Sequence, residues 1–172
     1  MSEAKRRKVL LIGWDGADWE HITPLLDEGL LPNLEGLINR GVMGNLATLQ
    51  PVLSPMLWNS IATGKLADKH GILGFMEPDP DRTGARPVSS LSRTSKAIWN
   101  ILNQEGYRSN VTGWWASHPA EPINGAIISN MFNQVRRNPL RVPPGTIHPE
   151  SRSEELALEI RKSLHAAVSR RP

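Results

Sequence analysis

Near the start of the chain stands the segment Lys8-Val9-Leu10-Leu11-Ile12-Gly13, which is too short and too aliphatic for an amphipathic helix. It predicts a buried strand, and the following Trp14-Asp15-Gly16 predicts the turn that ends it. A carboxylate at the carboxyl end of such a strand faces the ligand crevice of an α/β sheet. Asp15 is therefore a candidate site residue, although an aspartate before glycine is also typical of an ordinary turn.

The second candidate site residue is Ser54, which stands with Pro55 before the apolar stretch 56–62. Thr63-Gly64 ends this stretch, so we expect a helix with the serine at its N-terminus, where backbone N–H groups attract anions. The same pattern is typical of a purely structural N-cap serine followed by a proline at the first helical position. A carboxylate, a hydroxyl and an anion-binding helix end together indicate phosphoester chemistry, in which Asp15 and Ser54 hold a metal and Ser54 is the nucleophile.

Helices and strands are predicted to alternate along the rest of the chain, and this order of elements is typical of an α/β fold. The predicted helices cover residues 23–29, 32–41 and 96–105, and the predicted extended segments cover 42–49, 108–114 and 125–130. Thr94 and Ser95 are expected to cap the helix at 96–105. A helix followed by a strand implies a right-handed crossover onto a parallel sheet.

We expect a single α/β domain over residues 1–172, and its open-edged strands suggest that this domain is incomplete. Around these elements the sequence predicts a basic tail at 1–7, an exposed loop at 76–92, a Pro- and Arg-rich loop at 133–152 and a C-terminal helix at 153–169.

Composition limits the class of protein. The chain has no cysteine, so a metal must be bound through oxygen or histidine nitrogen. The apolar runs are far shorter than the roughly 20 residues that cross a bilayer, and the basic start lacks a signal-peptide core, so we expect a cytoplasmic protein. The net charge of +3 comes from runs near the chain ends, and the tryptophans lie among apolar neighbours, so nucleic acid is not an expected partner.

Four stretches of the chain resemble the N-terminal part of the type I phosphodiesterase and nucleotide pyrophosphatase family, in the alkaline phosphatase superfamily. They are residues 9–16, 34–41, 53–71 and 113–121, within a resemblance that covers about residues 8–132. The most specific stretch places Ser54 where the family has its nucleophile, followed at the family's spacing by Thr63-Gly64 and then by His70-Gly71.

The resemblance implies an alkaline-phosphatase-like, three-layer α/β/α fold with a mostly parallel sheet. It also implies two divalent metal ions, usually zinc, and a small-molecule phosphoester substrate. Transferred to this sequence, it makes Asp15 a metal ligand and Ser54 both the nucleophile and a ligand. Metal coordination lowers the pKa of a hydroxyl enough to produce a nucleophile near neutral pH.

This sequence departs from the family pattern in three ways. Phe75 stands where the nucleotide pyrophosphatase branch has a phosphate-binding asparagine, so nucleotide specificity does not follow. That branch prefers threonine as nucleophile and has a proline two residues after it, whereas Pro55 directly follows Ser54. The family's remaining metal ligands lie in downstream motifs that this sequence lacks, so we expect half a metal site and little or no activity from the isolated chain.

The histidines offer few replacements for these ligands. His70 is expected to be packed or hydrogen-bonded, and His118 is a weaker candidate ligand past the end of a strand. Solvated positions are expected for His21, His148 and His165, and core or crevice-wall positions for Trp114 and Trp115. Two alternative functions stay open: a phosphomutase, phosphotransferase or phosphatase of the same superfamily, and a non-catalytic remnant or interaction domain.

Overall fold

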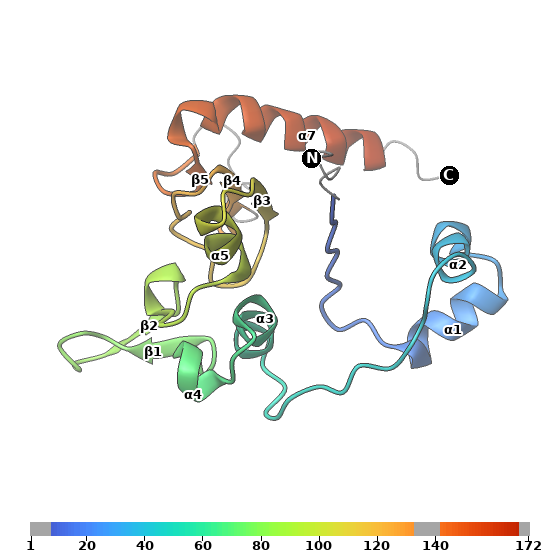
Figure 1. Cartoon of the computed structure of the whole chain (residues 1–172), viewed down its shortest axis with the longest axis horizontal. Helices are drawn as coiled ribbons and strands as arrows, with labels where there is room; N and C mark the ends of the chain where they lie inside the picture. Colours follow the sequence, from blue (N-terminus) through green and yellow to red (C-terminus); the bar gives the residue numbers. More distant parts are fainter. Residues whose placement is uncertain (1–7, 133–141, 169–172) are drawn as a thin grey trace, which may run out of the picture. The chain divides into compact units, whose positions relative to one another are not determined.

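The computed structural model of this protein describes residues 8–132 and 142–168, the last five of them by backbone alone. Its elements are drawn along the chain in Figure 1. Contacts within the chain define two compact units, residues 1–47 and residues 48–172. No helix in the described ranges is long and apolar enough to cross a membrane.

The first unit contains two helices, α1 (Trp19–Asp27) and α2 (Pro32–Ile38). α1 begins four residues before the predicted helix because the carboxylate of Asp18 caps it, accepting hydrogen bonds from the backbone N–H groups of Glu20 and His21 at 2.7 and 3.2 Å. The indole N–H of Trp19 donates to the carbonyl oxygen of Gly44 at 3.3 Å. This bond ties α1 to the segment that follows α2.

The prediction of a buried strand at residues 8–13 is wrong. The segment is not part of a sheet, and the side chains of Val9 and Leu10 are 91 % and 83 % exposed. The predicted extended segment at 42–49 likewise forms no strand. A strand becomes buried when neighbouring strands pair with it and helices cover it. The helices of this unit, α1 and α2, contain no buried residue themselves, so they do not cover the segment in this way.

The second unit begins with α3 (Ser54–Thr63) and α4 (Ala67–His70). A hairpin of β1 (Met76–Pro78) and β2 (Ala85–Pro87) follows, and then the 3-10 turn η1 (Ser90–Ser92). The predicted loop at 76–92 therefore contains an antiparallel strand pair. An ion pair between Arg86 and Glu77, with nitrogen and oxygen 2.8 Å apart, joins the two strands at a cross-strand position.

A second sheet has the strand order β3-β4-β5, with β3 at Ser109–Thr112, β4 at Gly125–Ile128 and β5 at Ile147–His148. β3 and β4 are parallel, whereas β4 and β5 are antiparallel. The mixed α/β class is confirmed. The described residues do not form the predicted three-layer, mostly parallel sheet, because two of the three strand pairings are antiparallel.

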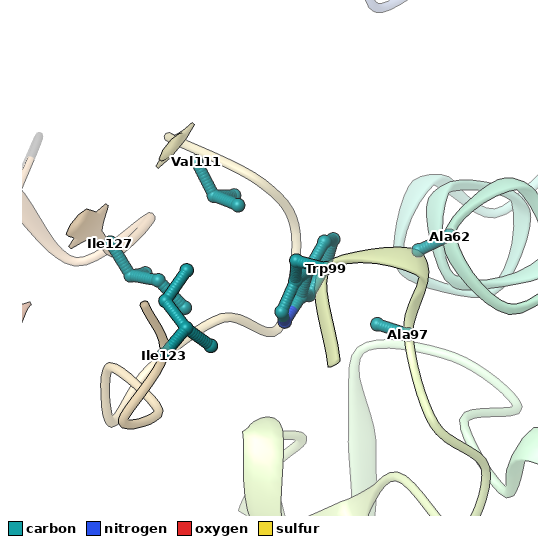
Figure 2. Close-up of a cluster of buried hydrophobic side chains, with 6 residues drawn as sticks. All are labelled: Ala62, Ala97, Trp99, Val111, Ile123 and Ile127. Atoms are coloured by element: carbon teal, nitrogen blue, oxygen red, sulfur yellow. The ribbon is translucent and has the colours of Figure 1, made fainter. Parts of the chain in front are cut away.

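Helix α5 (Ile98–Gln104) carries Trp99 into the main core of this unit. Figure 2 shows the Trp99 ring between side chains of the β3–β4 region, such as Val111 and Ile127, and the small side chains Ala62 and Ala97. A second cluster joins β4 and β5 to the C-terminal helix α7 (Ser153–Val168) through Ile128, Phe132, Ile147 and Ala157. The 3-10 turn η2 (Glu150–Arg152) precedes α7, which confirms the predicted C-terminal helix.

The cap of α5 differs from the predicted one. The side-chain oxygen of Asn100 accepts a hydrogen bond from the backbone N–H of Ala97 at 2.9 Å. Thr94 and Ser95 both donate from their hydroxyls to the carbonyl oxygen of Lys69, at 2.8 Å each. The two hydroxyls thus join the approach to α5 with the end of α4, and an asparagine inside the helix satisfies the helix N-terminus.

Candidate functional site

Ser54 lies at the first position of α3, and Leu53 occupies the N-cap position in an extended conformation. The helix therefore begins at Ser54, as predicted, whereas the alternative N-cap role belongs to Leu53. The side chain of Leu53 makes no capping hydrogen bond. Because N–H groups of a first helical turn have no acceptor inside the helix, they give the half-buried Ser54 a surrounding that favours an anion.

Asn59 connects this first turn to the chain that follows β3. Its side chain is fully buried, and its amide N–H₂ donates to the carbonyl oxygen of Pro55 at 2.8 Å and to that of Trp115 at 3.2 Å. Its own side-chain oxygen is buried without a hydrogen-bond partner among the described residues. Asn59 therefore holds Trp115 beside the residue that follows Ser54.

Trp115 also makes an aromatic contact with Phe75. The rings of Phe75 and Trp115 meet edge to face, with centroids 5.6 Å apart and planes at 85°. A Cβ atom added to Gly74, the residue before Phe75, would lie 3.5 Å from Cδ1 of Leu53. The Trp115 ring thus packs on Phe75, and its backbone carbonyl is held by Asn59 of α3.

Trp114 points instead into the core, as predicted for this pair. Its ring makes edge contacts with Trp58 and Trp99, at centroid distances of 5.3 and 5.9 Å. Its indole N–H donates to the carbonyl oxygen of Trp58 at 3.0 Å. These contacts pack the turn after β3 against α3 and α5.

The pair Ser60 and His70 has the composition of a nucleophile and base, but its hydrogen bonds exclude that role. His70 is fully buried, and its Nδ1 accepts a hydrogen bond from the backbone N–H of Ile72 at 3.2 Å. The ring proton is therefore on Nε2, which donates to Oγ of Ser60 at 3.0 Å. A nitrogen that donates to a hydroxyl cannot take its proton, so the predicted structural role of His70 is confirmed.

The remaining histidines lie in different surroundings. Nδ1 of His118 is 3.3 Å from Oγ of the buried Ser129, just beyond the end of β4. His21 is exposed, as predicted, and contacts Asp18. His148 is not solvated as predicted, because it lies in β5 and its Nε2 donates to the carbonyl oxygen of Ile123 at 3.2 Å. The side chain of His165 lies outside the described residues.

One buried polar network near the site was missed from the sequence. The carboxylate of Glu121 accepts hydrogen bonds from Arg93 at 2.5 Å, from the indole of Trp99 at 2.9 Å and from Asn100 at 3.3 Å. The Arg93 guanidinium also lies 5.1 Å from the centre of the Trp99 ring. The network fixes the loop between β3 and β4 to α5. No local pattern relates residues 93 and 121, so only the fold reveals their pairing.

Comparison with known protein families identifies the family of this chain. The family model described as type I phosphodiesterase / nucleotide pyrophosphatase matches residues 9–169. The chain belongs to this family. The match extends beyond residue 132, where the resemblance read from the sequence ends, and it includes α7. No curated protein and no solved structure matches the chain.

The type I phosphodiesterase / nucleotide pyrophosphatase family consists of hydrolases of small phosphoesters and is generally metal-dependent. The described residues do not by themselves fit a metal ion, because they contain no group of three or more histidine, aspartate or glutamate side chains that could hold one. Zinc sites in proteins use about four ligands. Asp15 and Ser54 belong to different units of the chain, and their sharing of a metal stays a prediction.

Proposed function

We propose that this chain supplies the nucleophile of a phosphoester hydrolase. The hydroxyl oxygen of Ser54 attacks phosphorus in line with the ester oxygen, so that the new Oγ–P bond forms as the P–O bond to the alcohol breaks. The departing alcohol takes up a proton. Water then attacks the phosphoserine, the Oγ–P bond breaks, and Ser54 regains its proton as the phosphate product leaves.

The observation that carries this proposal is the position of Ser54 as the first residue of α3, after an N-cap residue, Leu53, whose side chain makes no capping hydrogen bond. Backbone N–H groups at such an end donate to phosphoryl oxygens, and the helix dipole favours negative charge there. Family membership supports the assignment. The spacing from Ser54 to Thr63-Gly64 and His70-Gly71 is also the spacing that the resemblance implies around a nucleophile.

The proposed site extends beyond these residues. We propose that Asp15 and the Ser54 oxygen are ligands of a divalent metal, with zinc as the expected ion and two ions in the complete site. Since the described residues hold no cluster of three or more ligands, we propose that this chain carries only part of that site. Such a metal, when bound, would favour the ionised form of the serine hydroxyl.

The test uses the 172-residue chain and follows the backbone amides of α3 by NMR during titration with inorganic phosphate. We expect shifts concentrated at Ser54 and Met56, because Pro55 has no backbone N–H and that of Leu57 already donates to the carbonyl oxygen of Leu53 at 3.0 Å. Ser54→Ala removes a hydrogen bond to a charged group and should weaken phosphate binding about tenfold. The matched control is Ser153→Ala, since Ser153 is the first residue of a different helix, α7. Phosphate shifts that avoid α3, or that are equally strong in Ser54→Ala, would contradict the proposal.

A turnover assay tests the partial-site proposal separately. With zinc present, the chain should cleave bis-p-nitrophenyl phosphate no faster than the Ser54→Ala variant, because the metal ligands of this chain alone are too few. Zinc-dependent cleavage that Ser54→Ala abolishes would show that the chain holds a complete site.

A further inference from the structure

We propose that α7 forms a two-fold symmetric, antiparallel contact with the α7 of a second copy of this chain. One face of the helix makes the contact; it consists of Glu154, Ala157, Leu158 and Arg161 and is termed the α7 stripe. The contact involves none of the residues of the proposed catalytic site, and it does not depend on that proposal.

The α7 stripe lines an open groove of about 610 Å³ on the second unit. The other lining residues come from the segment 142–145 before β5, from η2 and from the first residue of α7. Positions 154, 157, 158 and 161 lie three or four residues apart, so they share one side of the helix. A groove bordered in this way fits an amphipathic helix whose contact residues have the same spacing.

The middle of the stripe is apolar and leaves surface for a partner. The side chain of Leu158 is 51 % exposed, whereas Ala157 is 2 % exposed and belongs to the second core cluster. Both residues line the groove. A single exposed leucine is ordinary on a protein surface. This one lies beside the small Ala157, where a leucine from a second helix can be buried.

The two ends of the stripe carry opposite charges. Within the part of the chain that the structure describes, neither Glu154 nor Arg161 makes an ion pair or a side-chain hydrogen bond, unlike the neighbouring pair of Arg152 and Glu155. Glu154 and Arg161 are seven residues apart, about 10 Å along the helix, which is too far for them to pair with each other. Glu150, which also lines the groove, adds a second carboxylate on the N-terminal side.

Antiparallel pairing of two identical stripes satisfies these charges. With the two-fold axis between positions 157 and 158, Glu154 of each copy lies opposite Arg161 of the other copy. Ala157 of each copy then lies opposite Leu158 of the other, so a small and a large side chain meet at the centre. Parallel pairing in register would place like charges opposite each other, which is unfavourable. Charge complementarity therefore selects a second copy, in one orientation, as the occupant of the groove.

Sedimentation velocity of the 172-residue chain at several concentrations tests the contact. We expect a reversible dimer with a Kd of about 10 to 100 μM, because the contact is small and its ion pairs are exposed. Arg161→Glu should weaken dimerisation at least about tenfold, since both ion pairs become like-charge contacts. Adding Glu154→Arg to this variant exchanges the charges and should restore the Kd to within about threefold. The control is Lys162→Glu, the same reversal at an exposed neighbour outside the groove, which should change the Kd less than about twofold.

Three results would overturn the contact. They are a chain that stays monomeric about tenfold above this concentration range, a dimer that Arg161→Glu does not weaken, and a double variant that does not recover. Circular dichroism checks that each variant keeps its helices.

A cross-linking experiment tests the orientation without reversing a charge. The natural chain has no cysteine, so Glu154→Cys and Arg161→Cys each introduce a single thiol. When the two variants are mixed with oxidised glutathione, we expect the disulfide between positions 154 and 161 in clear excess over its statistical share, since the mixed dimer keeps one ion pair and places the thiols opposite each other. A statistical mixture of the three disulfides would overturn the antiparallel contact.

Discussion

His70 shows how a single buried side chain can stabilise the neighbourhood of Ser54 without chemistry. Its ring accepts the N–H of Ile72 and donates to Ser60, so both ring nitrogens are used while the imidazole is neutral. Burial lowers the pKa of His70 below its ordinary value of 6.5, with the Arg93 charge as a smaller cause in the same direction. A protonated ring would lose the bond from Ile72, because Nδ1 would become a donor.

The lowered pKa predicts a pH-dependent stability. Below about pH 6.5 the unfolded chain takes up a proton at His70 that the folded chain resists, so the free energy of unfolding should fall as pH drops from 7 to 5. Urea unfolding at several pH values measures this. His70→Gln should flatten the slope in this window, whereas His21→Gln, at an exposed site, should keep it. An unchanged slope in His70→Gln would contradict this assignment.

Asn59 stabilises the helix end directly, and its role can be measured apart from binding. Replacing it by leucine keeps the volume but removes the side-chain donor that bonds the carbonyl oxygens of Pro55 and Trp115. We expect Asn59→Leu to cost about 1 to 3 kcal/mol in the free energy of unfolding, partly offset by removal of the unpaired Asn59 oxygen. Thermal or urea unfolding measures the change, and a stability equal to that of the natural sequence would show that the two bonds are dispensable.

At the scale of elements, the parallel pair β3–β4 depends on a close backbone approach. Gly125 lies opposite Ser109 in the register and has φ +147°, a conformation that side-chain-bearing residues rarely adopt. A Cβ atom placed there would lie 1.8 Å from the carbonyl oxygen of Ser109. The glycine therefore allows the two strands to pair at their first residues.

Gly125→Ala should accordingly destabilise the second unit by at least about 2 kcal/mol, because the strands must separate or the backbone must change. Urea unfolding followed by circular dichroism measures the loss. Gly74→Ala is the control, since its added Cβ would meet only an ordinary contact of 3.5 Å and its backbone has no positive φ. Equal effects of the two substitutions would contradict the role of the β3–β4 approach.

At the scale of the whole molecule, burial is distributed unequally between the two units. α1 and α2 contain no buried residue, whereas the second unit has two buried apolar clusters that join helices to its three-stranded sheet. Local opening costs little free energy where few apolar contacts are lost. We therefore expect the backbone hydrogen bonds of the first unit to open more often than those of the second unit.

Amide hydrogen exchange should report this difference. Backbone amides of α1 and α2 are expected to exchange at least about tenfold faster than those of β3 and β4, after correction for intrinsic rates. Mass spectrometry of peptides from residues 19–38 and 109–128 measures both sets in one sample. Equal protection of the two sets would show that the first unit is stabilised by contacts beyond its own helices.

The sequence alone predicts several helix ends and strands because interactions between residues close in the chain determine them. Pro32 at the start of α2, Gly64 in the left-handed conformation after α3, and the acidic first turn of α7 all act within one or two turns of the chain. Periodic apolar residues likewise predicted α5, β3 and β4 to within a few residues. The same kind of signal placed Ser54 at a helix start, which is where the structure has it.

Only the tertiary structure decided which of these elements pair and what surrounds the serine. The apolar segment at 8–13 reads as a buried strand, yet strand formation requires a neighbouring edge that its own residues cannot provide. The bonds from Asn59 to Trp115, and from Arg93 to Glu121, join positions far apart in the chain, whose proximity depends on packing. Sequence by itself thus determined the helix that carries Ser54. Long-range contacts determined how that helix packs, because side chains distant along the chain meet only after the fold has formed.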